Sequence, residues 1–95
     1  MSLDGLAGWL TRADRIGYAE GRFSSEQCSK EGFPPAPYQS TVEGGQLRWT
    51  ATEEDGRGNT IQWEGTVEGD RMKGTLVWTR AGKARRYGWS AVRVR

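Results

Sequence analysis

The chain has 95 residues, a formal net charge of +2 and ten aromatic residues, which supply the bulky apolar surface that a disordered chain lacks. This length suits a single domain, residues 1–95, with a modest core. No stretch approaches the roughly 18 consecutive apolar residues of a membrane-spanning helix. The sequence contains no histidine, which excludes Ser-His and Cys-His nucleophile pairs and most zinc sites.

The N-terminal stretch is the least regular part of the sequence. Leucine and alanine recur with helical spacing over residues 2–12, and Ser2 is a suitable N-cap. Gly5 and Gly8 weaken a helix, so a short strand around Trp9 is the alternative. We expect residues 1–13 to form a weakly structured or helical lead-in to the domain.

The stretch WEGTVEGDRMKGTLVWT, residues 63–79, predicts a β-hairpin with a two-residue turn at Gly69-Asp70. Counting outward from this turn pairs Gly65 with Gly74. Alternation of side chains then gives one polar face and one apolar face. The apolar face carries Ile61, Trp63, Val67, Met72, Leu76 and Trp78. A slip of one residue would expose this whole face, so the register is well specified.

The Gly65–Gly74 pair falls on the apolar face of this hairpin. Glycine in a strand permits strong coiling, or the close approach of a large ring. We expect the two glycines to bend a barrel wall, with Trp63 and Trp78 covering the gap. A ligand lying over the glycines is the alternative.

Further turns extend the pattern. Gly44-Gly45 is a second two-residue turn, which brings Tyr38 opposite Ala51 on the apolar face. Glu20-Gly21 is a third, and EEDGRGN, residues 53–59, is typical of a longer polar loop.

The last turn is expected at residues 81–84. A four-residue loop there places Tyr87 opposite Trp78 and Trp89 opposite Leu76, and so buries both rings. Val92 then has the wrong parity, which predicts a bulge near Ala91 or a final strand covered on both sides.

Together these turns predict an all-β fold, an antiparallel up-and-down meander of about seven strands that forms a small barrel or half-barrel. The strands are expected near residues 14–18, 22–28, 38–43, 46–53, 59–68, 71–80 and 85–94. An incomplete first strand would leave an open sheet edge, which invites pairing with a second copy of the chain.

Several motifs together resemble a known group of proteins. The segments GRFSSEQC (21–28) and GF (32–33), the hairpin of residues 63–79 and YGW (87–89) carry the resemblance. They are similar to segments of small β-rich bacterial proteins, often exported, with a lipocalin-like or calycin-like meander and no established activity. The resemblance covers about residues 14–91, and the chain departs from the group at its N-terminus, where those proteins have a fuller first strand.

The resemblance implies a fold and a cellular location, and it carries over no catalytic residues. It implies an exported or periplasmic protein if a signal peptide has been removed; none is visible in this sequence, and the cytoplasm is the alternative.

The residues suggest no catalysis. Glu53, Glu54 and Asp55 are adjacent carboxylates, but we expect them in a solvated loop, with a catalytic or metal-binding role as the alternative. Cys28 fits a small buried apolar residue better than a reactive thiol. We therefore expect a protein that is not an enzyme and that holds neither cofactor nor metal.

A pocket inside the barrel is the first binding hypothesis. The side chains expected to line it are Tyr38, Trp49, Trp63, Trp78, Tyr87 and Trp89. Arg80 and Arg86 are expected near its mouth, where they could hold the anionic group of a small ligand. A solidly packed core is the alternative, because a barrel of about eight strands holds little beyond its own side chains. Unpaired indole N–H groups would favour the ligand.

An uneven charge distribution supports a second hypothesis. Residues 71–95 contain eight basic residues and no acidic one. Such a hairpin could bind single-stranded nucleic acid or an anionic polysaccharide. Burial of its aromatic rings opposes this, and so does local neutralisation by cross-strand neighbours such as Glu68 and Arg71. A structural module that forms a homodimer through an open sheet edge is the third hypothesis.

Overall fold

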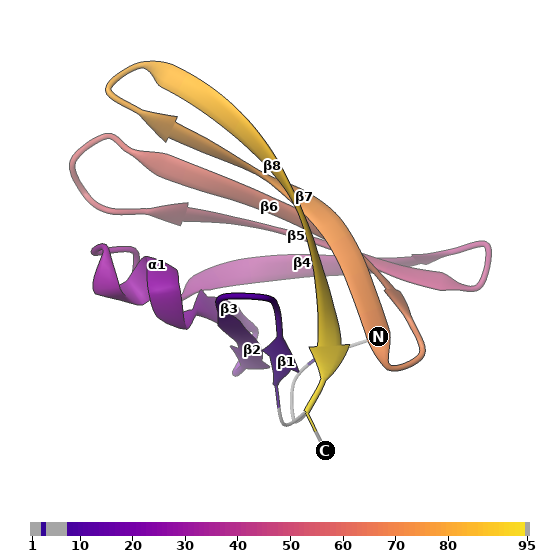
Figure 1. Cartoon of the computed structure of the whole chain (residues 1–95). Coiled ribbons are helices and arrows are strands. Elements are labelled where there is room, and N and C mark those ends of the chain that lie inside the picture. The colour runs from indigo at the N-terminus through magenta and orange to yellow at the C-terminus, as the bar shows by residue number, and fades with distance from the viewer. Residues whose placement is uncertain (1–2, 4–7, 95) are drawn as a thin grey trace.

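The computed structural model describes Leu3 and residues 8–94, and within them the chain is an antiparallel β-barrel. Eight strands follow one another around the barrel in sequence order, and the last pairs with the first (Figure 1). The elements are β1 (Trp9–Leu10), β2 (Arg15–Ala19), β3 (Arg22–Ser25), α1 (Glu26–Lys30), β4 (Ala36–Glu43), β5 (Gln46–Glu54), β6 (Thr60–Glu68), β7 (Arg71–Arg80) and β8 (Lys83–Arg93).

The predicted register of the central hairpin is confirmed. The pairs of β6 and β7 run from Glu68↔Arg71 beside the turn, through Gly65↔Gly74, to Ile61↔Trp78 and one pair beyond. The turn at Gly44-Gly45 likewise pairs Tyr38 with Ala51, as expected. Both registers follow from two-residue turns, whose length leaves the flanking strands no freedom to slip.

The barrel closes through a short strand around Trp9. β1 pairs with Ile16 and Arg15 of β2 on one side, and with Arg93 and Val92 of β8 on the other. The half-barrel is therefore wrong, and the closed barrel is correct. Residues 1–2 and 4–7 of the expected helical lead-in lie outside the described residues, while Trp9–Leu10 form the strand that was the alternative.

The strand expected over residues 22–28 ends early. It stops at Ser25, whose side-chain oxygen accepts a hydrogen bond from the Cys28 N–H and so caps α1. The helix ends at Lys30 with Glu31 as its C-cap, and Gly32 follows with a φ of 97° and a backbone N–H that donates to the carbonyl of Ser29. The Phe33 N–H reaches back to the Cys28 carbonyl, which completes a Schellman motif.

The turn between β7 and β8 is shorter than expected. It contains only Ala81 and Gly82, with φ angles of 52° and 78°, so Leu76 pairs with Tyr87 and Gly74 with Trp89. Two- and four-residue loops give the same parity, so Tyr87 and Trp89 keep the face assigned to them. Their partners on β7 lie two residues further from the turn than expected. The predicted bulge is absent from the described strand, because the pairing runs without interruption to Val92, which is 52% exposed.

The barrel interior is filled by aromatic rings. Trp49 and Trp63 lie against Phe23 at centroid distances of 4.8 and 4.9 Å, and both also contact Trp89. Tyr18 meets the edge of Trp49 at 5.2 Å. The rings are tilted or edge-to-face, the arrangements that aromatic pairs prefer.

Gly65 lies beneath two of these rings. A Cβ at this position would lie 2.6 Å from the Trp49 Nε1 and 3.0 Å from the Trp89 ring. The rings that cover the gap are therefore Trp49 and Trp89, and the expectation of Trp63 and Trp78 is wrong. A Cβ on Gly74 would overlap the backbone of β6, so the two strands approach each other closely where the wall curves.

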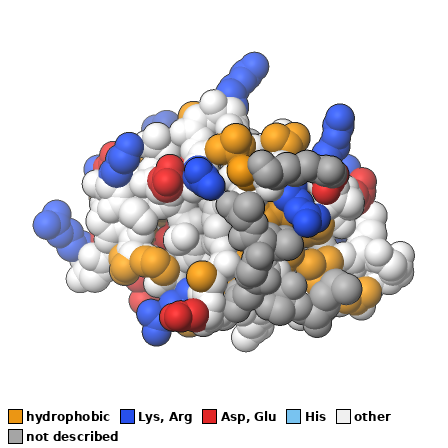
Figure 2. Space-filling view, turned by 90° about the horizontal axis from the view of Figure 1, so that it is seen from below, with side chains coloured by type: hydrophobic (Ala, Val, Ile, Leu, Met, Phe, Trp, Pro, Cys, Tyr) orange, Lys and Arg blue, Asp and Glu red, His pale blue; other side chains and the backbone are white. Residues whose placement is uncertain are grey.

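The hairpin turns lie at the two ends of the barrel. The tips of the β5–β6 and β7–β8 hairpins lie at one end with α1, and the end of β8 and the β6–β7 turn lie at the other (Figure 1). Figure 2, the view from below, shows acidic and basic side chains interspersed among hydrophobic ones.

Among the described residues, no helix is long and apolar enough to cross a membrane.

Candidate functional site

A pocket of about 410 Å³ lies against the outer end of the β7–β8 hairpin. Its lining residues come from that hairpin, and they are Trp78, Arg80, Ala81, Lys83, Arg85 and Tyr87. The pocket therefore combines two aromatic rings with three cationic side chains.

The two-residue turn explains why these side chains share one face. Arg80 pairs with Lys83, and Trp78 pairs with Arg85, so paired residues project to the same side of the ribbon. This side continues the inner face of the barrel. Trp78 is held in place by Phe33, whose ring meets it edge-on at 6.0 Å. The Arg80 guanidinium lies 5.6 Å from the centre of the Trp78 ring, within cation–π range.

The loop between β5 and β6 is hydrogen-bonded to the turn between β7 and β8. The Ala81 N–H donates to the Asn59 Oδ1 at 3.2 Å, and the Asn59 amide in turn donates to the Asp55 carboxylate at 2.7 Å. Hydrogen bonds from Asn59 and from the Arg57 N–H hold the pKa of Asp55 below its usual value. The polar loop between β5 and β6 thus bridges the two hairpin tips.

Among the described residues, no ion pair neutralises the cations of the pocket. The described residues contain ion pairs at Arg48–Glu43 and Arg93–Asp70, and neither involves Arg80, Lys83 or Arg85. No carboxylate lines the pocket. Three like charges close together on one face repel each other, and a bound anion would relieve that repulsion.

Three indole N–H groups are buried without a partner among the described residues. They belong to Trp9, Trp78 and Trp89, and the Glu53 Oε2 is the fourth buried polar atom of this kind. The Trp49 N–H, by contrast, donates to the Met72 sulfur at 3.2 Å, and the Trp63 N–H donates to the Glu53 Oε1 at 2.9 Å. Buried donors are normally paired, so an unpaired one beside a pocket favours a ligand.

Glu53 is buried inside the barrel, and its assignment to a solvated loop is wrong. It belongs to β5, pairs with Ile61 and is 0% exposed. Burial raises the pKa of its carboxyl to about 7, against the opposing effects of the Trp63 hydrogen bond and the Cys28 thiol; Asp14 adds to the rise. Parity signals this burial, because Trp49, Ala51 and Glu53 alternate along one strand face.

A second polar group secures α1 near Glu53. The Asp14 carboxylate accepts hydrogen bonds from the Ser25 hydroxyl and from the Gln27 N–H. Burial raises the pKa of the Cys28 thiol to about 11, which suits the unreactive packing role expected for this residue. These contacts hold α1 against the barrel.

The structure separates the eight predicted ligand-binding residues. Trp49 and Trp63 are core residues, and Trp89 packs between them. The Tyr38 hydroxyl accepts a hydrogen bond from the Leu3 N–H at 2.9 Å. Of the eight, only Trp78, Arg80 and Tyr87 line the cationic pocket.

Arg86 lies on the other face of β8, beside Thr52, Glu64 and Val77. The cations that join Arg80 are instead Lys83 and Arg85, which sequence reasoning missed. A two-residue turn at Ala81-Gly82 would have identified Lys83, because it places this residue directly opposite Arg80. Parity alone places Arg85 on the same face.

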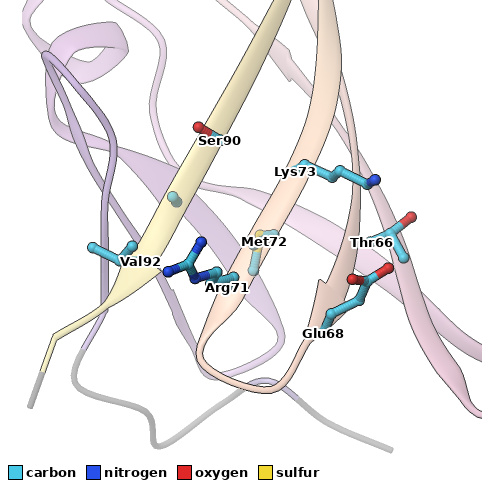
Figure 3. Close-up of a pocket in the computed structure, with 8 residues that line it drawn as sticks. Thr66, Glu68, Arg71, Met72, Lys73, Ser90 and Val92 are labelled. Carbon is cyan, nitrogen blue, oxygen red and sulfur yellow. The ribbon is translucent and has the colours of Figure 1, made fainter.

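Another hollow, of about 260 Å³, lies near the β6–β7 turn at the other end of the barrel. Figure 3 shows Lys73 reaching from β7 toward Thr66, with Glu68 beside it, while Arg71 lies toward Val92 of β8. This surface carries both charges and no unpaired buried group, so we do not assign it a ligand.

The fold and the pocket define a small closed antiparallel β-barrel with a cationic, aromatic pocket at one end. Comparison of the chain with protein-family models, curated proteins and solved structures found no match. No cluster of three potential metal-ligating side chains occurs within residues 8–94 or at Leu3.

Proposed function

We propose that this protein is a small non-catalytic binding domain, which takes an organic anion with an apolar or aromatic body at the cationic pocket. The observation that carries the proposal is the set of three unneutralised cations, Arg80, Lys83 and Arg85, around the half-buried Trp78. Because aromatic rings fill the barrel interior, the proposed ligand binds at the hairpin end and outside the core.

The chemistry of the lining suggests how such a ligand is held. Guanidinium groups bind carboxylate, sulfonate or phosphate oxygens with charge-assisted hydrogen bonds. The rings of Trp78 and Tyr87 offer flat apolar surface for the body of the ligand. A lipocalin-like class fits this proposal, since lipocalins are up-and-down barrels of eight strands. An exported location stays a proposal of the same resemblance.

Two neighbouring arginines provide the test. Anilinonaphthalenesulfonate, an aromatic anion, should bind with saturable fluorescence, and Arg85→Gln should weaken its binding by about tenfold. Arg86→Gln removes the same charge from the adjacent residue on the opposite face, and should change the affinity less than about twofold. Equal effects of the two substitutions would show that general charge, and not the pocket, binds the probe.

Tyr87 supports a second candidate function. It is 47% exposed, so the argument that burial keeps this ring from a polymer does not hold. Single-stranded nucleic acid or an anionic polysaccharide could stack on Tyr87 and contact the cations beside it. A polymer that contacts several cations would lose affinity steeply with salt, with a log–log slope near −0.7 per neutralised phosphate for a single-stranded nucleic acid. A small monovalent anion would show a slope of about −1 or shallower.

Homodimerisation is the third candidate. β8 offers a free edge, but it carries Lys83, Arg85 and Arg86, and antiparallel self-pairing would gather these cations from both copies on one ribbon. Charge therefore opposes a dimer formed through this edge, and sedimentation at low salt should show a monomer.

A further inference from the structure

The last strand has a partner along only one of its edges for most of its length. β8 pairs with β7 from Lys83 to Val92. On its other edge, β1 pairs only with Val92 and Arg93. Within the described part of the chain, no strand pairs with residues 83–91 of β8 on that side.

The register determines which backbone groups face the free edge. In a hairpin with a two-residue turn, Arg80 and Lys83 form the first hydrogen-bonded pair, so the odd-numbered residues of β8 bond to β7. The Arg93 N–H donates to the Asp70 carbonyl at 2.9 Å, in agreement with this parity. The Val94 N–H points the other way and donates to the Gly8 carbonyl, also at 2.9 Å.

Four residues therefore direct their N–H and C=O groups to the free edge: Ala84, Arg86, Gly88 and Ser90. All four are exposed. A Cβ built on Gly88 would meet nothing within 4 Å, so the face of the strand is also open at this residue. An open edge of this length is a template for an additional strand.

The positive charge of the edge favours an acidic strand over a second copy of β8. Lys83, Arg85 and Arg86 lie within four consecutive residues, no acid occurs in residues 71–95, and the ion pairs of the described residues include none of the three cations. A second copy of β8 would bring like charges together, whereas an acidic strand would pair opposite charges across the ribbon. In the C-terminal half of the edge, Tyr87 and Trp89 lie on the inner face of β8. Their rings suit contact with apolar side chains of an added strand.

We propose that the free edge of β8, residues 83–90, binds an extended acidic segment of a partner protein by strand addition. The partner strand carries acids opposite Lys83, Arg85 and Arg86, and apolar residues opposite Tyr87 and Trp89. Its main chain bonds to Ala84, Arg86, Gly88 and Ser90. Lys83, Arg85 and Tyr87 also line the pocket, but the partner strand is held through the backbone groups of the edge, so the proposal does not depend on the proposed anion ligand.

A designed peptide tests the proposal. Acetyl-TVTVEETE-amide, antiparallel to β8, places its acids opposite the three cations and its valines opposite the two rings. It should bind in a calorimetric titration and slow amide hydrogen exchange at Ala84, Arg86, Gly88 and Ser90. The lysine analogue TVTVKKTK should bind about tenfold more weakly or not at all.

Gly88 provides matched variants. Gly88→Pro removes the edge-facing N–H and leaves the β7 ladder intact, as edge prolines do, so it should weaken peptide binding by about tenfold. Gly88→Ala adds a side chain in open space, keeps the N–H and should bind normally. Both variants should keep the circular dichroism and the thermal transition of the parent. Failure of the acidic peptide to bind, equal binding by the lysine analogue, or unchanged binding to Gly88→Pro would overturn the proposal. So would a dimer that forms in solution through this edge.

Discussion

Within the described residues, the Glu53 carboxyl is buried beside the Trp63 indole with only one of its oxygens paired. Its raised pKa of about 7 means that it stays protonated in the folded chain under mildly acidic conditions. In the unfolded chain the carboxyl ionises near its ordinary value of 4.5. Between these two pH values the folded state binds more protons than the unfolded state, so this residue makes stability fall as pH rises.

Glu53→Gln should remove this pH dependence, because glutamine keeps an acceptor for Trp63 and cannot ionise. We expect the urea midpoints of parent and variant to be similar near pH 4.5. At pH 8 the variant should be more stable by on the order of 1–3 kcal/mol. Urea titrations at both pH values measure the difference, in which the titration of other groups largely cancels. Parallel pH profiles would mean that Glu53 is ionised or solvated in the fold.

Glycine at position 65 shows how one residue permits the packing of two rings. Gly65→Ala would place a methyl group within 3.0 Å of Trp49 and of Trp89, and neither ring can withdraw from the filled interior. We expect a loss of about 1–3 kcal/mol in the free energy of unfolding. Gly88→Ala is the control, since its Cβ meets nothing, and should change stability by less than about 0.5 kcal/mol. Equal effects of the two substitutions would show that strand glycines matter here only through the backbone.

At the scale of elements, tight turns made most of the fold predictable. Gly44-Gly45 and Gly69-Asp70 fix the pairing by counting, and the hairpins around them form as expected. The helix α1 was missed because it is only five residues long and is defined by its caps, Ser25 and Glu31, and not by an apolar face. β1 is two residues long, too short for any alternation to show.

The candidate site was less predictable for the same reason. Parity assigned the correct face to Tyr87 and Trp89, but a turn two residues too long shifted their partners on β7. Lys83 was thereby placed in a loop. The choice of Arg86 over Arg85 was a separate error, because parity places Arg85 on the face of Arg80 with either turn. Burial of Tyr87 could not be inferred from parity, because the hairpin extends past the end of the barrel (Figure 1).

At the scale of the whole molecule, the barrel separates packing from binding. Its closed middle is filled by aromatic side chains, and its unneutralised cations and its free edge lie where β7 and β8 extend beyond the shorter strands. In this account the wall and core supply rigidity, and the last hairpin supplies recognition.

The indole N–H resonances of the five tryptophans offer the most direct measurement of this account. In a titration with anilinonaphthalenesulfonate, followed by nitrogen–proton correlation spectra, the Trp78 indole should shift as the pocket fills. The indoles of Trp49 and Trp63, bonded to Met72 and Glu53 in the core, should keep their positions. Shifts at Trp49 and Trp63 without one at Trp78 would place the ligand inside the barrel and contradict the account.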